Sequence, residues 1–341
     1  MKMKRTSKLL TIAAAALLLL TAATQEKTTT IFIIGDSTAA NKDISGGKQE
    51  RGWGMALQCF FDDNIVVDNH AVNGRSSLSF INEGRWDKVL EKMKPGDYVI
   101  IQFGHNDEKP KADRHTDPGS TFDYNLAKFV RETREHGGIP VLMNCVVRRN
   151  FFVNAPENDD DEKLRTTTFK DGVKMVEGDS LIDTHGLYRV APRDVAQRMN
   201  CHFVDANQIT HDLEQGLGTE ASKKLHMWFL PGEEPSVPNG RQDNTHYNVY
   251  GAHVVAKLLA DALCKEIPIL RKYRADADIT VDRKGRGDYL SLQQAVDNAL
   301  LRPNDSTTIQ ILGGEWTKPL LPRKNKITFV LREGATWKKT N

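Results

Sequence analysis

The run Ile31-Phe32-Ile33-Ile34-Gly35-Asp36-Ser37-Thr38 joins four apolar residues to an abrupt Gly-Asp-Ser turn. A continuous apolar run of this kind is typical of a strand that is buried on both faces of a parallel sheet. Gly35 allows the backbone to turn sharply, which exposes Ser37 at the start of the next segment. Alternatively, Asp36 and Ser37 cap a following helix. In either case, the run predicts a buried strand with a serine at its carboxyl end.

Similar apolar runs recur along the chain, with helix-like stretches between them. The runs lie at residues 30–34, 65–67, 98–103, 140–147 and 201–204. The helix-like stretches lie at residues 55–61, 78–93, 122–136, 190–199 and 249–264. Five strands that alternate with helices predict a doubly wound, three-layer α/β/α domain around a five-stranded parallel sheet. Residues 154–180, with an acidic run at 158–162, are expected to form an exposed insertion.

Four loops that carry polar residues follow the first four predicted strands. They lie at residues 35–37, 69–76, 104–107 and 148–149. In a doubly wound sheet, ligands bind outside the carboxyl ends of the strands. The four loops are therefore expected to converge on one rim and to form a site there.

Ser37 is the candidate nucleophile of this site, and Asp243 and His246 are its candidate partners. A serine hydroxyl needs a base that removes its proton, and the imidazole of that base needs an acceptor that fixes its tautomer. Asp243 and His246 lie three residues apart, far from Ser37 in the sequence. With ten histidines in the chain, an Asp-x-x-His spacing is specific only in this context. We interpret the three residues as a Ser-His-Asp triad.

An acyl-transfer enzyme also needs hydrogen-bond donors for the oxyanion that forms at the attacked carbonyl. The candidate donors are the backbone N–H groups of Ser37 and Gly74 and the side-chain amide of Asn106. Taken singly, Gly74 is also consistent with a turn glycine, and Asn106 with a loop-stabilising Asx turn. Their occurrence together with the triad favours an oxyanion hole.

Several cationic or polar residues on the same loops are candidates for substrate binding. They are Arg75, His105, Arg148 and Arg149. A guanidinium pairs with a carboxylate through two parallel hydrogen bonds, so these arginines suit an acidic polymer. The alternative is that they hold the loops together. The other histidines, including His185 and His211, are expected to be structural or substrate-facing, and no metal or cofactor site is predicted.

The first 23 residues are expected to be a signal peptide. A basic head at residues 2–8 precedes an apolar stretch at residues 9–23, which is shorter than the roughly 20 residues of a spanning helix. A retained membrane anchor is the alternative. The net charge of +2 falls to −2 when the four basic residues of this segment leave. We therefore expect export to the periplasm or beyond the cell, with no nucleic-acid partner and no membrane association after processing.

The four cysteines, Cys59, Cys145, Cys201 and Cys264, are scattered and show no spacing typical of a zinc site. Export permits disulfides. Because three of the four lie in apolar runs, buried free thiols are favoured over a disulfide.

Four short blocks of the chain resemble those of the SGNH (GDSL-like) hydrolase superfamily. The blocks are Gly35-Asp36-Ser37, Gly74, Asn106, and Asp243 with His246. Longer runs at residues 52–54, 74–77, 83–87, 102–107 and 243–246 are similar to the rhamnogalacturonan acetylesterase family. The resemblance spans about residues 30–263 and implies a flavodoxin-like SGNH fold. It also implies metal-independent deacetylation of pectic polysaccharide by Ser37, Asp243 and His246. The acidic insertion departs from the family pattern and is expected to reshape the substrate groove.

Residues 276–341 are a second unit that resembles the opening of a pectin methylesterase β-helix. The run Gly285-Arg286-Gly287-Asp288-Tyr289 and the helix-like residues 292–297 carry the likeness. The motifs that bear that family's paired aspartates are absent from the sequence. We therefore expect a truncated, partial β-helix that is marginally ordered, has an unpaired edge and lacks methylesterase activity. A small accessory cap of strands is the alternative.

The predicted function is that of an exported esterase that removes O-acetyl groups from rhamnogalacturonan, with residues 27–268 as its catalytic domain. Alternatives are an esterase for another acetylated glycan such as xylan, a lipid esterase or thioesterase, and a non-catalytic glycan-binding module. A lipid enzyme needs an apolar acyl channel, whereas the site loops are rich in Arg, His, Asn and Trp. A nucleophile elbow of the α/β-hydrolase type is disfavoured, because the serine follows the first strand and the acid and base are three residues apart.

Overall fold

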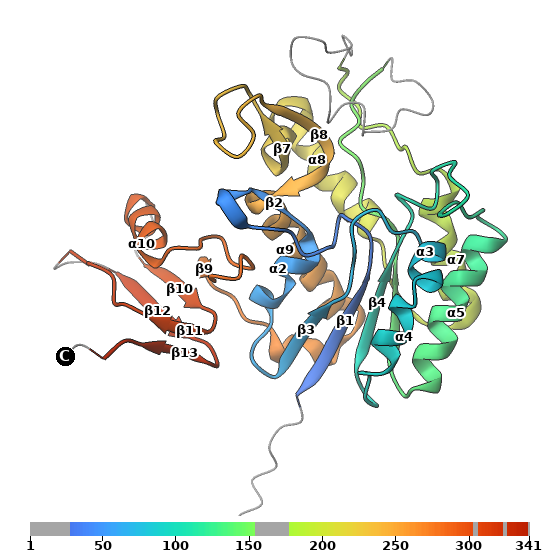
Figure 1. Ribbon diagram of the computed structural model, residues 1–341, viewed down its shortest axis with the longest axis horizontal. Helices are drawn as coiled ribbons and strands as arrows, with labels where there is room; N and C mark the ends of the chain where they lie inside the picture. Colours follow the sequence, from blue (N-terminus) through green and yellow to red (C-terminus); the bar gives the residue numbers. More distant parts are fainter. Residues whose placement is uncertain (1–27, 154–176, 303–305, 323–325, 340–341) are drawn as a thin grey trace, which may run out of the picture.

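The computed structural model describes residues 28–153, 177–302, 306–322 and 326–339. Its centre is a five-stranded parallel sheet in the order β3-β1-β4-β5-β6 (Figure 1). The strands are β1 (Thr29–Gly35), β3 (Ile65–Asn69), β4 (Tyr98–Gln102), β5 (Ile139–Met143) and β6 (His202–Val204). The chain runs from β1 to one neighbour, β3, and then to the other, β4. This order confirms the predicted doubly wound sheet and places a switch point beside β1.

Helices cover both faces of this sheet, as the apolar runs predicted. One face packs under α2 (Trp53–Ala56) and α9 (Val249–Glu266). The other packs under α3 (Ser77–Asn82), α4 (Arg85–Leu90), α5 (Thr121–Glu135) and α7 (Leu187–Met199). Alternate residues of β1 divide between the two cores, with Ile31 and Ile33 in the first and Phe32 and Ile34 in the second. All four are at most 2% exposed, which explains why the strand is apolar at every position.

Some helix boundaries differ from the sequence prediction for local reasons. The predicted helix 78–93 is two short helices, α3 and α4, separated at Gly84, which has a φ of 63°. The predicted helix 55–61 is α2 followed by a 3₁₀ turn, η2 (Leu57–Phe60). A further helix, α8 (Ala206–Ser222), was not predicted. The expected insertion lies largely outside the described residues, which resume at residue 177.

A small antiparallel sheet above the carboxyl edge was also not predicted. It consists of β2 (Glu50–Arg51), β8 (Arg241–Asn248) and β7 (His226–Phe229), with β8 in the middle (Figure 1). Asp243 and His246 lie on β8. The sequence of this strand, RQDNTHYN, contains no apolar run and therefore gives no strand signal.

The C-terminal tail forms parallel strands with a core of its own. β9 (Ile279–Val281), β10 (Thr307–Ile311) and β12 (Ile327–Leu331) form one sheet, and β11 (Gly314–Trp316) pairs with β13 (Ala335–Trp337). The helix α10 (Leu292–Leu301) packs over this core. Parallel strands built from successive turns of chain are also found in β-helix coils.

The tail is docked on the catalytic domain, in contrast to the expected marginal order. Arg332 contacts Asp63 through Nε at 2.9 Å, and the Gln310 amide donates to Cys59 O at 3.1 Å. Arg51 reaches Gly285 O at 3.0 Å. The tail therefore packs on a surface of the catalytic domain, whereas the sequence analysis treated it as having no partner surface. β12 lies at one edge of the three-stranded sheet, where Val330 is 41% exposed.

The four cysteines are free, and Cys59, Cys145 and Cys264 are buried, which confirms the thiol prediction. None of the helices in the described part of the chain is long and apolar enough to cross a bilayer. The predicted signal peptide lies outside the described residues.

Candidate active site

Ser37 lies in a tight turn directly after β1. The Asp36 carboxylate, which is fully buried, accepts from the Thr38 N–H at 2.9 Å and from the Thr38 hydroxyl at 2.7 Å. Burial raises the pKa of Asp36, and the hydrogen bonds from Thr38 oppose that rise. Residues 37–40 form a turn rather than a helix, so the capping alternative is not what the structure contains. A Cβ at Gly35 would lie 2.6 Å from Gln102 O of β4, so the glycine is needed for the close approach of the strands.

Ser37, His246 and Asp243 form a connected hydrogen-bond series. His246 Nε2 lies 2.8 Å from Ser37 Oγ, and His246 Nδ1 lies 3.1 Å from both carboxylate oxygens of Asp243. An Nδ1–H that donates to the carboxylate leaves Nε2 as the acceptor for the serine hydroxyl. His246 is 2% exposed and Asp243 is fully buried, so little water competes for these bonds. Three residues that sequence reasoning selected separately are thus in direct contact.

A bulge in β8 brings Asp243 and His246 together. Residues 242 and 247 of β8 pair with residues 228 and 226 of β7, so four residues on β8 oppose a single residue on β7. Side chains three residues apart on a regular strand point to opposite faces. Here the extra residues loop out, and Asp243 Oδ1 accepts the backbone N–H groups of Thr245 and His246, each at 2.9 Å. The bulge re-aims the two side chains onto one another.

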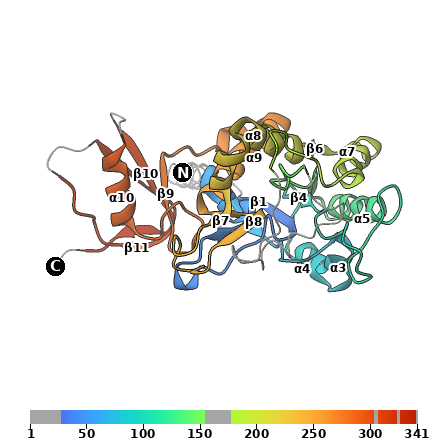
Figure 2. The ribbon, with the colours of Figure 1, turned by 90° about the horizontal axis from the view of Figure 1, so that it is seen from above.

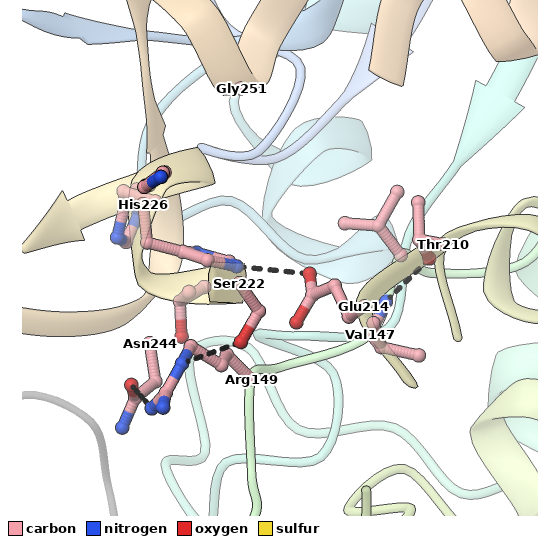
Figure 3. A network of polar contacts seen from close by, with 12 residues as sticks. Val147, Arg149, Thr210, Glu214, Ser222, His226, Asn244 and Gly251 are labelled. Carbon is pink, nitrogen blue, oxygen red and sulfur yellow. Dashed lines mark hydrogen bonds and ion pairs between the residues drawn. The ribbon is translucent and has the colours of Figure 1, made fainter. Parts of the chain in front are cut away.

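Arg149 holds this bulge in place through its contacts with Asn244, so the prediction that Arg149 binds substrate is wrong. Its side chain is fully buried, and the guanidinium donates to Ser222 Oγ at 3.0 Å and to Asn244 Oδ1 at 3.2 Å (Figure 3). Its backbone N–H donates to Asn244 O at 2.8 Å. The guanidinium also lies over the Trp228 ring, 5.1 Å from the centroid. Because these contacts use the hydrogen-bonding groups of the guanidinium, Arg149 is held by the protein itself. Its role is to keep Asn244 in place between Asp243 and His246.

A partly buried network of charges, Lys42–Glu50–Arg241, extends the triad. Arg241 pairs with Asp243 Oδ2 through Nη2 and with Glu50 Oε2 through Nη1, the latter at 2.9 Å. Glu50 Oε1 lies 2.8 Å from Lys42 Nζ, which also donates to Asn73 Oδ1 at 2.6 Å. Burial opposes ionisation of Glu50, but His246, Lys42 and Arg241 outweigh it and lower its pKa to about 2. Sequence reasoning missed this network because its members lie on three separate segments.

The same network reaches the loop that carries Gly74. Asn73 precedes Gly74, which has a φ of 73° and open space where a Cβ would stand. Asn106 is 4% exposed, and its amide donates to Arg75 O at 3.3 Å. Within the described residues, the backbone N–H groups of Ser37 and Gly74 have no hydrogen-bond acceptor. The structure therefore brings together the loops of Gly74 and Asn106 and leaves two backbone donors unused beside them.

Asp107 anchors these two loops to one another. Its carboxylate accepts from the Ser77 N–H at 3.0 Å and from the Thr116 hydroxyl at 2.9 Å. Burial raises the pKa of Asp107 to about 7 despite these hydrogen bonds. The loop after β4 is thus tied to the first turn of α3, so Asn106 and Gly74 keep a fixed relation.

Of the three remaining candidate substrate-binding residues, Arg75 and Arg148 are partly exposed at the rim of the site and His105 is buried. Arg75 Nε is 3.1 Å from both carboxylate oxygens of Glu83, and its side chain is 34% exposed. Arg148 pairs with Glu108 and donates to Thr184 Oγ1 at 3.1 Å. His105 is 3% exposed, and neither of its ring nitrogens has a hydrogen-bond partner among the described residues. Burial lowers the pKa of His105 well below its usual value, with His185 and Arg148 adding to the effect, so the ring is neutral.

His185, which was expected to be either structural or substrate-facing, is hydrogen-bonded to the protein through both ring nitrogens. Its Nδ1 lies 2.9 Å from Glu108 Oε2, and its Nε2 lies 3.1 Å from Val146 O. The edge of this ring packs against His105, with the centroids 4.5 Å apart. His185 therefore supports His105 rather than facing a ligand.

Comparison with known proteins identifies relatives of this chain. The model of the GDSL-like Lipase/Acylhydrolase family matches residues 33–254. The rhamnogalacturonan acetylesterase RhgT of Bacillus subtilis is 36% identical over 232 residues, which cover 68% of this chain and 88% of that protein. The probable rhamnogalacturonan acetylesterase YesY of the same organism is 28% identical over 236 residues, or 68% and 91% of the two chains. The crystal structure of B. subtilis YxiM superposes with a TM-score of 0.52 at 24% identity, covering 70% of this chain and 56% of that one.

Proposed function

Because this chain belongs to the GDSL-like lipase/acylhydrolase family, we propose that it removes O-acetyl groups from rhamnogalacturonan with Ser37 as the nucleophile. It is a carboxylic ester hydrolase by family membership, and the resemblance to rhamnogalacturonan acetylesterases is confirmed. The observation that carries the mechanism is the 2.8 Å contact between His246 Nε2 and Ser37 Oγ. The names of RhgT and YesY support the substrate class.

In the first half of the proposed reaction, Ser37 Oγ attacks the acetyl carbonyl carbon while its proton passes to His246 Nε2. Asp243 holds the ring through Nδ1 and stabilises the imidazolium that forms. The tetrahedral intermediate collapses when the bond to the sugar oxygen breaks. The proton on His246 passes to that oxygen, which leaves as a free hydroxyl, and the acetyl group remains on Ser37.

In the second half, water attacks the acetyl-serine. His246 accepts a proton from the water and returns it to Ser37 Oγ, so acetate leaves and the enzyme is restored. In both tetrahedral intermediates the negative oxygen is stabilised by hydrogen-bond donors. We assign these to the unused N–H groups of Ser37 and Gly74 and to the Asn106 amide, whose loop is anchored by Asp107. Fixed donors need no reorganisation at the moment of reaction, which makes them effective.

An acidic sugar polymer suits the rim of this site. Arg75 and Arg148 pair with Glu83 and Glu108, and their side chains are still 34% and 13% exposed, so a galacturonate carboxylate can approach them. The His105 ring is neutral, and both of its nitrogens are buried, so it supports the site from within. We assign substrate contact to Arg75 and Arg148 and not to His105 or Arg149.

We propose further that the protein is exported to the periplasm or the extracellular medium. The basic head and the apolar stretch within residues 1–23 support this location. A polysaccharide substrate is encountered outside the cytoplasm, so the location and the proposed substrate are consistent. Cleavage of the segment, measured by N-terminal sequencing of the protein from a culture fraction, tests the proposal.

Acetate release from a panel of esters tests the substrate assignment. The panel consists of acetylated rhamnogalacturonan, acetylated homogalacturonan, acetylated xylan and a small aryl acetate. We expect the highest kcat/KM on acetylated rhamnogalacturonan. Preference for xylan, or hydrolysis of long-chain acyl esters in place of acetates, would contradict the assignment and favour a different esterase of the same family.

A further inference from the structure

A cavity of ≈ 480 Å³ lies where the C-terminal tail meets the catalytic domain. The catalytic domain contributes the start of α9, the end of β7 and residues near β2, and the tail contributes β9 and the residues that flank it. Figures 1 and 2 show the tail against the side of the domain that carries α2 and α9. The volume is within the range of small-ligand sites, which is about 300–1,000 Å³. The space is open to solvent on one side, and both units contribute to its walls.

The walls combine flat aromatic rings with cations. Phe60 and Tyr250 come from the catalytic domain and Tyr289 from the tail. Lys257 on α9 and Arg302 at the end of α10 add positive charge from the two sides. Tyr250 is 61% exposed, although its ring lines a cavity that a ligand can fill. Aromatic rings offer apolar faces to the C–H faces of pyranose rings, and the cations suit a carboxylate.

The buried histidine of the cavity has an unused nitrogen. His253 is 7% exposed, and its Nδ1 lies 3.3 Å from Asp288 Oδ1. Its Nε2 is buried without a hydrogen-bond partner among the described residues. When Nδ1–H donates to Asp288, Nε2 is an acceptor that a ligand hydroxyl can satisfy. Among the described buried side-chain atoms without a partner, His253 Nε2 is the one that belongs to a residue lining this cavity, where a ligand hydroxyl can supply the missing hydrogen bond.

The acidic groups of the cavity are occupied by the protein. Asp288 Oδ2 accepts from the N–H and the hydroxyl of Thr280, both at 2.7 Å. Asp278 Oδ2 accepts from the Thr308 N–H at 2.7 Å. The carboxylates therefore support the walls through these bonds, and Lys257 and Arg302 balance their negative charges and remain the groups that can pair with an anionic ligand; Arg302 Nη1 also donates to Asp278 O at 3.1 Å.

The cavity lies close to the triad, because two residues that line it follow His246 within four positions in the sequence. Asn248, which lines it, follows His246 by two residues, so the two Cα atoms are at most about 7 Å apart. Tyr250 follows by four residues and is within about 14 Å by the same measure. A polysaccharide bound at Ser37 extends over such distances.

We propose that this junction cavity binds a uronic-acid-containing stretch of the polysaccharide, with the tail completing the site. The proposal rests on the proposed function, since the same polymer occupies the triad. A pyranose ring stacks on Tyr250, its carboxylate pairs with Lys257 and Arg302, and a hydroxyl donates to His253 Nε2. The tail thereby acts as part of the glycan-binding surface rather than as an enzyme.

Direct binding of a de-acetylated galacturonate oligosaccharide to the full chain, measured by calorimetry, tests the proposal without using the ester. We expect Tyr250→Ala to weaken binding about three- to tenfold. Lys257→Gln and Arg302→Gln should weaken it by a similar factor and reduce its salt dependence. Tyr124→Ala is the matched control, because Tyr124 is 63% exposed but lies on α5, outside the cavity lining. Tyr250 and Lys257 are exposed, so their variants are expected to fold.

The outcomes separate this proposal from the proposed function. Equal binding by the Tyr250→Ala, Lys257→Gln and Tyr124→Ala variants, or no binding by the unaltered protein, overturns the cavity site even if acetate release occurs. Selective loss of binding in the cavity variants supports the site even if acetylated rhamnogalacturonan is not hydrolysed. An oligosaccharide whose carboxylates have been reduced to alcohols should bind more weakly than the acidic one, and equal affinity for both contradicts the carboxylate assignment.

Discussion

Neutralising Arg241 and neutralising Glu50, the two charges behind the triad, should shift the acidic limb of the pH profile in opposite directions. His246 must be neutral to accept the Ser37 proton, so activity falls on the acidic side as the imidazole becomes charged. Arg241 disfavours the imidazolium, and Glu50 favours it. Arg241→Gln should therefore shift the acidic limb of kcat/KM to higher pH, and Glu50→Gln should shift it to lower pH.

The size of the shift follows from the geometry of the Arg241 contact. Arg241 Nη2 and His246 Nδ1 both contact Asp243 Oδ2, so the two nitrogens lie within about 6 Å of each other. At about 7 Å between charge centres and an effective dielectric constant of about 20, a unit charge contributes about 2 kcal/mol. That energy corresponds to a shift of between one and two pH units. The other charged or titratable groups around His246, namely Asp243, Lys42 and His105, are unchanged in both variants.

The assay is kcat/KM for a small aryl acetate as a function of pH, with folding checked by circular dichroism at each pH. Because the aryl acetate makes no contact with the polymer-binding rim, the profile reports the triad. A uniform loss of activity in both variants, with the acidic limb in its original place, would refute the electrostatic reasoning. Shifts of the same sign in both variants would also refute it.

Three further predictions concern the oxyanion donors, the bulge and acid stability. Asn106→Ala should lower kcat by roughly 10²–10³ while the protein stays folded, and a change below threefold measured on the aryl acetate would exclude the donor role. Arg149→Met should lower the free energy of unfolding by about 2–4 kcal/mol in urea titrations, because Ser222, Asn244 and Glu177 lose their charged donor; Arg75→Met, at the exposed rim, should change it by less than about 1 kcal/mol. Glu50 and Glu108 have pKa values lowered to about 2, so their contribution to stability is present above the usual value of 4.5 and is lost as pH falls toward 2. Glu50→Gln should flatten the decline of thermal midpoint over that range, and an unchanged decline would contradict the assignment.

The central sheet was predictable because burial on both faces leaves a continuous apolar run in each strand. β1 and β4 are examples, since all residues from Ile31 to Ile34 and from Tyr98 to Gln102 are buried. β8 was not predictable by this rule. Its middle residues are polar because they loop out of the ladder to form the site, and the bulge is fixed by partners on β7 and by Arg149. α8 was missed for a different reason, since Gly216 and Gly218 interrupt its helical pattern.

The grouping of Ser37, Asp243 and His246 was predictable because these residues occur together with Gly74 and Asn106, although each of them alone has a structural explanation. The roles of the arginines were not, since residue type does not reveal burial. Arg148 and Arg149 are adjacent in the sequence, but one pairs with Glu108 at the rim and the other is fully enclosed. The Lys42–Glu50–Arg241 network leaves no local signal at all, because its members meet only after β2 has paired with β8.

The rate of acetate release from acetylated rhamnogalacturonan, compared between the unaltered protein and Ser37→Ala, tests the central claim most directly. The triad acts as a unit, so loss of the nucleophile should lower kcat by on the order of 10⁶. The circular dichroism spectrum should be unchanged, because the side chain of Ser37 makes its contact with His246 and supports no core packing. A folded Ser37→Ala protein that releases acetate at a near-normal rate would contradict the account.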